Sequence, residues 1–439
     1  MYSDKAQKKL TAARAVVGDR LSITAEGKPY EGILMPRIEL GDTDCIVLKL
    51  KSGYNIGISA DRIEKIEIVE RMIKRIEKPR VIGMEKSAKD NVVILGCGGT
   101  IASKIEYKTG GTFPAITPEE LVTSFPALAD KKLKSRILFN LFSEDFNPSI
   151  WQEIAEETAK EIKDGAKGII LMHGTDTMHY TSAALSFMLK TPVPVVLVGA
   201  QRSSDRGSSD NLMNMMSSVE LAESDIAEIG ICMHGTSNDD FCYFHPGTKV
   251  RKMHTSRRDA FQTINRKPIA KVFWEENKIE ALGPYKARGK QKLEVDTKLN
   301  PNVALIYTYP GMQPEFVEKL GGMFDGIVLA SGGLGQVSSN PSNDPRIKPL
   351  VPAIRSVIGR GVPVVIAPQT IYGRIDLNVY SAGRLLKDTG AIGNYCDWTP
   401  ETALVKLMWT LGHTKDMKKI SEMMLTNYAG EISERSESV

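Results

Sequence analysis

The chain has 439 residues, 42% of them hydrophobic and 25% charged, which is enough for two or three domains with buried cores. The formal net charge of +4 is small against 57 basic and 53 acidic residues, so charge neither favours nor excludes a nucleic-acid partner. The five cysteines form no CxxC pair and the histidines no HExxH motif, so we expect reduced thiols and no metal site. With no signal pattern and no apolar run long enough to span a bilayer, we expect a cytoplasmic protein without membrane contact.

Short strands are predicted for the first region of the chain, residues 11–70. Alternating or short apolar runs separated by turn residues mark residues 20–24, 31–34, 45–50, 55–58 and 63–69. About five short strands in this length predict a small β-barrel of the SH3-like or Sm-like kind over residues 1–75, a structural or docking module. Residues 76–90 carry many charges and read as a solvent-exposed linker.

Continuous apolar runs predict an α/β domain over residues 91–293. The runs cover residues 92–95, 168–172, 193–198 and 229–233. Such runs are typical of parallel strands that are buried on both faces. Helical patterns separate them, among them one that begins with Asn147 and Pro148 and one over residues 177–189.

A second, smaller α/β domain is predicted over residues 300–425. Strands are expected at residues 303–307, 326–330 and 364–367, and helices at residues 341–361 and 399–411. The polar tail, residues 426–439, is expected to fray from Glu431 onward. The predicted fold class is therefore α/β, with two body domains that contain parallel sheets and a small β-barrel in front of them.

Candidate site residues follow the predicted strands, because open parallel sheets bind ligands at the carboxyl ends of their strands. Gly98, Gly99 and Thr100 follow the first run, where a dinucleotide site would need a third glycine in place of Ile101. Thr175 and Asp176 follow the second run, either as a site pair or as caps of the next helix.

Two further motifs are ambiguous on their own. His234-Gly235-Thr236 nearly copies the segment around Thr175 but lacks the acidic residue, so we expect no catalytic role for it. Lys252 lies in a basic run, which would normally be a solvated face.

Four motifs in order resemble the bacterial-type L-asparaginase family. The resemblance covers about 330 residues. The motifs that carry it are Gly98-Gly99-Thr100-Ile101-Ala102, the segment from His173 to Met178, Val198-Gly199-Ala200, and Lys252 followed by Asp259-Ala260-Phe261. One departure is Cys97, where the family usually has threonine. We interpret this cysteine as a packing residue, since no histidine partner accompanies it.

The resemblance implies a role for each matching residue. Thr100 matches the primary nucleophile, and Thr175, Asp176 and Lys252 match the second catalytic group. Tyr107 resembles a tyrosine of the mobile lid. The substrate-binding positions implied by the family are Gly99, Ser143, Glu144, Gly174 and Ala200, with Glu144 in place of the usual glutamine. No metal ligand is implied.

These assignments agree with the chemistry of amide hydrolysis. An amide carbon is a poor electrophile and a threonine hydroxyl is a weak nucleophile, so a base must take the proton and return it to the departing ammonia. Lys252 could be that base only as a neutral amine, which requires burial. Which group serves Thr100 stays open.

The N-terminal barrel and linker are absent from standalone asparaginases. Joined to an asparaginase-like body, they resemble the D subunits of archaeal glutamyl-tRNA(Gln) amidotransferases. That resemblance implies glutamine or asparagine as amide donor and a heterotetramer of two D and two E subunits, in which the D subunits form a homodimer. It assigns ATP, Mg²⁺ and most contacts with tRNA(Gln) to the E subunits, and no Walker A motif or cofactor pattern occurs in this chain. The alternatives are a free L-asparaginase and an inactive binding scaffold.

Overall fold

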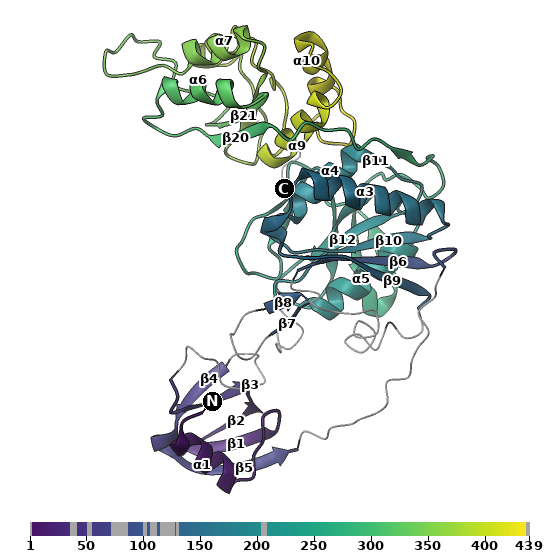
Figure 1. Ribbon diagram of the computed structural model, residues 1–439, viewed down its shortest axis with the longest axis vertical. Coiled ribbons are helices and arrows are strands. Elements are labelled where there is room, and N and C mark those ends of the chain that lie inside the picture. The colour runs from purple at the N-terminus through teal and green to yellow at the C-terminus, as the bar shows by residue number, and fades with distance from the viewer. Residues whose placement is uncertain are drawn as a thin grey trace.

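The computed structural model describes residues 2–35, 42–50, 55–71, 87–99, 103–105, 112–114, 128, 131–202 and 209–435. Most of the predicted linker, residues 76–90, lies outside the described residues, as do Thr100 and Tyr107. Figure 1 shows a small N-terminal sheet domain and an α/β body with two lobes. We call residues 87–295 of the body the N-terminal lobe and residues 300–435 the C-terminal lobe.

The N-terminal domain is a five-stranded antiparallel sheet in the order β4-β3-β2-β1-β5. Its strands are β1 (Arg20–Ala25), β2 (Lys28–Leu34), β3 (Cys45–Leu50), β4 (Asn55–Ser59) and β5 (Ile63–Glu70), with the short helix η1 (Ala60–Arg62) before β5. Alternate residues of β1 are buried, which fits the predicted pattern. A helix that we did not predict, α1 (Asp4–Ala12), begins at the N-cap Ser3 and buries Ala6 and Leu10 in the same core.

The N-terminal lobe contains an eight-stranded mixed sheet in the order β18-β17-β14-β13-β12-β10-β6-β9. Five neighbouring strands are parallel, namely β9 (Leu133–Leu141), β6 (Val92–Gly98), β10 (Gly168–Met172), β12 (Val195–Val198) and β13 (Ile229–His234). The edge strands β14 (Cys242–Pro246), β17 (Ala270–Phe273) and β18 (Lys278–Ala281) are antiparallel. The predicted parallel strands are present, and the antiparallel edge was not predicted.

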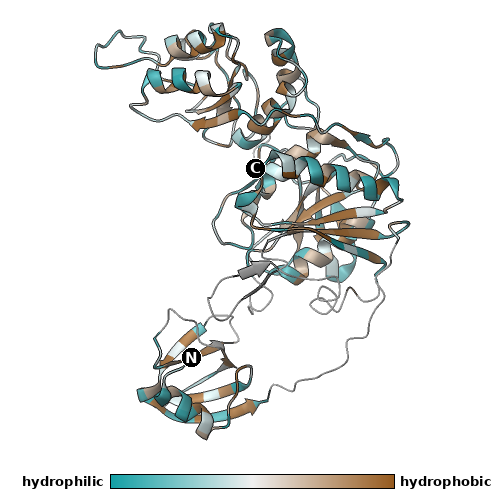
Figure 2. Ribbon diagram, viewed as in Figure 1, coloured by the Kyte–Doolittle hydropathy of each residue, from teal (hydrophilic) through white to brown (hydrophobic). Residues whose placement is uncertain are grey.

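Helices cover both faces of this sheet, which explains the continuous apolar strands seen in Figure 2. Side chains of α3 (Pro148–Lys163) and α4 (Met178–Met188) pack on one face with Val93 and Leu95. Side chains of α5 (Asn211–Glu223) pack on the other face with Val92 and Ile94. Smaller elements of this lobe are β7 (Ser103–Ile105), β8 (Thr112–Pro114), η4 (Ser143–Asp145), β11 (Leu189–Lys190), β15 (Val250–Lys252), β16 (Phe261–Thr263), η5 (Trp274–Glu276) and β19 (Glu294–Val295).

The C-terminal lobe has a three-stranded parallel sheet in the order β20-β21-β22. Its elements are β20 (Val303–Tyr307), α6 (Pro314–Met323), β21 (Gly326–Ser331), α7 (Val351–Gly359), β22 (Val364–Pro368), α8 (Ser381–Lys387), α9 (Pro400–Leu411) and α10 (Met417–Leu425). Residues of α9 share one core with α4 and with Val328 and Val365 of the small sheet, so α9 joins the two lobes.

The predicted helix over residues 341–361 was wrong for its first half. Only Val351–Gly359 is helical. Asn340 and Asn343 have positive φ angles of 49° and 54°, and the Asn340 side chain accepts from the backbone N–H of Asp344. Asparagine tolerates this left-handed conformation, and prolines at 345 and 349 would break a continuous helix.

The predicted fraying from Glu431 was also wrong for the described part of the tail. Lys406 Nζ lies 2.6 Å from Glu431 Oε1, and both side chains are completely buried. Nearby, the equally buried Lys249 and Asp397 form a second pair at 2.6 Å, and Asp397 accepts from the backbone N–H of Ser433. The tail is held because each buried lysine needs its carboxylate.

Among the described residues, no helix is both long enough and apolar enough to cross a membrane.

We expect Glu431→Gln to destabilise the body, because it leaves the buried ammonium of Lys406 without its counter-charge. The free energy of unfolding should fall by about 3 kcal/mol, measured from urea denaturation. Glu434→Gln, at an exposed position nearby, should change it by less than about 0.5 kcal/mol. Equal effects of the two changes would contradict a stabilising role for the buried pair.

Candidate functional site

The candidate site lies at the carboxyl ends of β9, β6, β10 and β12, which are neighbours in the sheet. The chain passes from β6 to β9 on one side and then to β10 on the other side of β6. Strand order therefore reverses at β6, and such a switch point leaves a crevice at the strand ends. Gly99 follows β6 there, and Thr100 comes next in the sequence, outside the described residues.

Glycines bring the backbone segments at these strand ends into contact. Gly99 has a φ of +88°, and a Cβ atom there would lie 2.4 Å from the backbone nitrogen of Gly174. A Cβ on Gly174 would lie 2.8 Å from Ser143 Cβ, and one on Gly199 would lie 2.8 Å from Thr175 Cγ2. Because real Cβ atoms cannot approach so closely, only glycine allows this packing.

Thr175, Asp176 and Lys252 form one hydrogen-bonded group. Lys252 Nζ donates to Thr175 Oγ1 at 2.9 Å and to Asp176 Oδ1 at 2.7 Å. Lys252 ends β15, which pairs with β16 in a hairpin, so the lysine reaches the strand ends from outside the main sheet. Its side chain is 10% exposed, whereas that of Asp176 is 66% exposed. The ammonium is thus largely shielded, and the carboxylate faces the open side of the site.

The other described positions implied by the resemblance lie around this group. Ser143 begins η4 and is buried, and its carbonyl accepts from Thr177 Oγ1 at 2.6 Å. Glu144 is the next residue and is exposed. Ala200 is buried where the chain leaves β12. The structure therefore brings together the described positions of the motifs.

An open pocket of about 400 Å³ adjoins Lys252 and contains groups that the sequence analysis missed. The Arg251 guanidinium donates to Glu401 Oε1 at 2.7 Å, although 150 residues separate them. Glu401 Oε2 and His179 Nδ1 are buried without a hydrogen-bond partner among the described residues. Burial lowers the pKa of His179 to about 4, so this ring is neutral. Apart from the basic run around Lys252, no sequence signal pointed to these residues.

His173 is a structural residue of the β10 end. Its ring nitrogens lie 2.6 Å from the carbonyl oxygen of Gly174 and 2.9 Å from Thr181 Oγ1, and its ring packs on Phe146. Burial lowers its pKa to about 4. The neutral ring therefore fixes the turn that presents Thr175.

A buried polar network holds the loop after β12. Asp210 accepts from the backbone N–H of Gln201 at 3.0 Å. Asn214 donates to Asp210 Oδ2 and to the Gly199 carbonyl, each at 3.0 Å. The side-chain oxygen of Asn214, Oδ1, lies 2.6 Å from His234 Nδ1. This network positions the segment that leads into Ala200.

His234 extends the network toward the loop that follows Lys252. His234 Nε2 lies 3.0 Å from Asp239 Oδ1, which also binds Arg258 Nη1 at 2.6 Å. Burial opposes a charge on His234, but Cys242, Asp239 and Asp210 outweigh it and raise its pKa. The motif at His234 thus links two loops of the site.

Cys97 has the environment of a packing residue. It is completely buried in the core of the lobe, and burial raises the pKa of its thiol to about 12. Such a thiol is not a nucleophile at neutral pH. Across the residues that the structure describes, no group of three or more His, Cys, Asp or Glu side chains is placed to hold a metal ion.

We expect Gly174→Ala to disturb the site, because its new Cβ would collide with Ser143. The free energy of unfolding should fall by about 2 kcal/mol, with a lower melting temperature in calorimetry. Gly283→Ala is the matched control, since a Cβ there meets no atom within 4 Å, and its melting temperature should stay the same or rise slightly. If the two variants melted alike, the close packing at Gly174 would be refuted.

Models of three protein families match successive parts of the chain. The GatD N-terminal domain matches residues 15–69, the N-terminal asparaginase domain matches residues 91–285, and the glutaminase/asparaginase C-terminal domain matches residues 302–424.

Relatives match over nearly the whole length, and they are D subunits of glutamyl-tRNA(Gln) amidotransferases. That of Pyrococcus furiosus is 48% identical over 427 residues, which cover 95% of each chain. Those of Methanobrevibacter smithii and Sulfolobus acidocaldarius are 44% and 43% identical. They cover 99% and 98% of this chain, and 98% and 95% of their own lengths.

Solved asparaginase structures share the fold of the body. The thermostable L-asparaginase from Thermococcus kodakarensis has a TM-score of 0.69 at 32% identity, covering 78% of this chain and 99% of its own. L-asparaginase I from Vibrio cholerae has a TM-score of 0.67 at 25% identity, covering 79% and 99%. The predicted fold class, an asparaginase-like α/β body preceded by a small β domain, is therefore confirmed.

Proposed function

This chain belongs to the family of D subunits of glutamyl-tRNA(Gln) amidotransferases, and from this premise we propose that it releases ammonia from an amide donor. The donor is glutamine or asparagine, and the ammonia converts Glu-tRNA(Gln) to Gln-tRNA(Gln) on a partner protein. The observation that carries the proposal is the hydrogen-bonded group of Thr175, Asp176 and Lys252 at the carboxyl ends of the parallel strands.

Thr100 and Thr175 have separate roles in the proposed reaction. In the first step the hydroxyl oxygen of Thr100 attacks the side-chain amide carbon, its proton passes to the amide nitrogen, and ammonia leaves. In the second step water attacks the resulting ester, releases the acid and restores the Thr100 hydroxyl. Lys252 exchanges a proton with the reacting groups through Thr175, and Asp176 orients the lysine. Tyr107 acts from the lid segment.

The surrounding positions hold the donor's amino-acid end. Ser143 and Glu144 lie in η4 beside the strand ends, and the exposed carboxylate of Glu144 suits an ammonium group. Gly99, Gly174 and Ala200 have little or no side chain, so the strand ends that border the donor carry no bulky group. Acceptance of both donors follows from recognition of the end that they share.

The amidotransferase reaction is divided between two kinds of subunits. The E subunits bind tRNA(Gln), use ATP and Mg²⁺ to activate the glutamate and receive the ammonia. This chain needs no cofactor of its own. The complex is a cytoplasmic heterotetramer of two D and two E subunits with contact between the D subunits. A free L-asparaginase is the alternative, and full-length similarity to D subunits, including the N-terminal domain, supports the amidotransferase.

Replacing the proposed catalytic residues should stop ammonia release from glutamine. Lys252→Met removes the proton carrier and should lower kcat by about a thousandfold, and Thr100→Ala should abolish turnover. Ammonia is measured in an enzyme-coupled assay. Lys267→Ala, at an exposed lysine, should leave the rate unchanged. Near-normal release by either catalytic variant, with an unchanged melting temperature, would reject the mechanism.

The place of this chain in an amidotransferase predicts that its amidase activity is coupled to the partner. Ammonia release by this chain alone should be slow, and added E subunits with Glu-tRNA(Gln) and ATP should raise it at least about tenfold. The assay follows ammonia and Gln-tRNA(Gln) together. Fast release that ignores the partner, the tRNA and ATP would instead establish the free asparaginase.

A further inference from the structure

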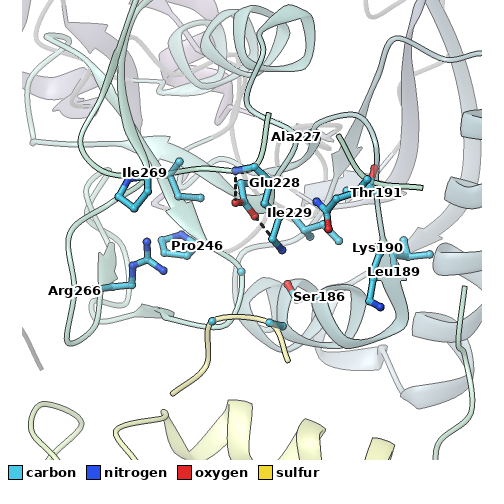
Figure 3. Close-up of a pocket in the computed structure, with 16 residues that line it drawn as sticks. Ser186, Leu189, Lys190, Thr191, Ala227, Glu228, Ile229, Pro246, Arg266 and Ile269 are labelled. Carbon is cyan, nitrogen blue, oxygen red and sulfur yellow. Dashed lines mark hydrogen bonds and ion pairs between the residues drawn. The ribbon is translucent and has the colours of Figure 1, made fainter. Parts of the chain in front are cut away.

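A second pocket lies between the N-terminal lobe and residues 429–430 of the C-terminal lobe, and neither Lys252 nor Asp176 lines it. Its volume is about 160 Å³. Figure 3 shows Arg266 and Pro246 on one side of it and Leu189, Lys190 and Thr191 on the other. Basic, acidic and apolar side chains line it together.

Arg266 is the unusual residue of this pocket. Its guanidinium has no hydrogen bond or ion pair to any described residue. The lysines of the lining have acidic neighbours: Lys190 Nζ lies 2.7 Å from Glu294 Oε2, and Lys286 Nζ lies 3.7 Å from Glu228 Oε2. A half-buried guanidinium without an anion is unfavourable, so an anionic ligand would satisfy it.

The nearby charges strengthen this argument. Burial lowers the pKa of Lys249 to about 8, and the positive charge of Arg266 acts in the same direction, while Asp397 opposes it. The carboxylate of Asp397 is already engaged by Lys249 and Ser433. Glu431 also opposes this lowering of the Lys249 pKa, so the repulsion that an anion beside Arg266 would reduce is the one between Arg266 and Lys249.

The size of the pocket limits the ligand. A drug-sized site has roughly 300–1,000 Å³, so this pocket suits a molecule of a few heavy atoms up to a small dicarboxylate. The planar guanidinium matches two oxygens of one carboxylate or phosphate. Gly247 packs closely against Ser186 in the pocket wall, since a Cβ atom at Gly247 would lie 2.5 Å from Ser186 Oγ.

Two elements connect this pocket to the candidate catalytic group. Ser186 lines the pocket near the end of α4, roughly 12 Å along the helix axis from Met178, and Asp176 lies two residues before Met178. Gly247 lines the pocket just before β15, which ends at Lys252. Ser182 Oγ donates to the Gly247 carbonyl at 2.8 Å and ties the two elements together.

We propose that this pocket binds a small oxyanion through Arg266 and that its occupancy changes the activity of the Lys252 group. The ligand class is a small carboxylate or inorganic phosphate. Binding is independent of the proposed amidase function, whereas the effect on activity rests on it. A bound anion lies against the end of α4 and the segment before β15. These elements lead to Asp176 and Lys252 respectively.

Isothermal titration of the full chain with succinate, acetate and phosphate tests the binding. Saturable binding of at least one probe is expected, and the arms separate carboxylate from phosphate ligands. Arg266→Gln should weaken it at least about tenfold, with Arg266→Lys intermediate. Arg346→Gln, at an exposed arginine of the C-terminal lobe, should bind like the parent chain. Lys252→Met should also bind normally, which separates this pocket from the catalytic group.

Ammonia release with and without the bound probe tests the second half of the proposal. The probe should change kcat of the parent chain by at least about twofold and leave the Arg266→Gln rate unchanged. No saturable binding to the parent, or equal binding to Arg266→Gln, overturns the site. Binding without any change in turnover overturns the link to Lys252, and an inactive parent chain would count only against the proposed function. If Arg266→Gln does not fold, Ser186→Leu, which fills the pocket, takes its place.

Discussion

Backbone contact at the carboxyl ends of the parallel strands is the constraint on which the rest of the site depends. Gly99 lies against the backbone of Gly174, and Gly174 lies against the side chain of Ser143, so three strand ends meet closely. This contact fixes where Thr175 stands, and Thr175 in turn gives Lys252 its hydrogen-bond acceptor. The hydroxyl and carboxylate groups are therefore positioned by the sheet, whose register has little freedom to slip.

Polar interactions fix the hairpin that carries Lys252. Lys252 comes from a hairpin outside the sheet, and His234, Asp239 and Arg258 tie the loop after it to the end of β13. The C-terminal lobe contributes through α9, whose Glu401 binds the residue next to the lysine. The site thus combines strand ends that are fixed by close packing with a hairpin that is fixed by charged side chains.

Local sequence patterns predicted most of the fold, because continuous apolar runs and short alternating runs are each compatible with few kinds of secondary structure. It failed where distant residues decide the outcome. The antiparallel strands β14, β17 and β18 contain polar residues among the apolar ones, and the burial of Glu431 depends on Lys406. Among site residues, Thr175 and Lys252 stood in recognisable motifs. The pair of Arg251 and Glu401 had no such signal, since only folding brings them together.

The exposure of Glu144 has a consequence for how this protein can evolve. Its neighbour Ser143 is locked between Gly174 and Thr177, so a change there alters the backbone of the whole strand edge. Glu144 is exposed and makes no such contact with the described residues, so its side chain can change in size or charge without disturbing that packing. Substitutions can therefore accumulate at position 144, while its neighbours at the strand ends tolerate few changes.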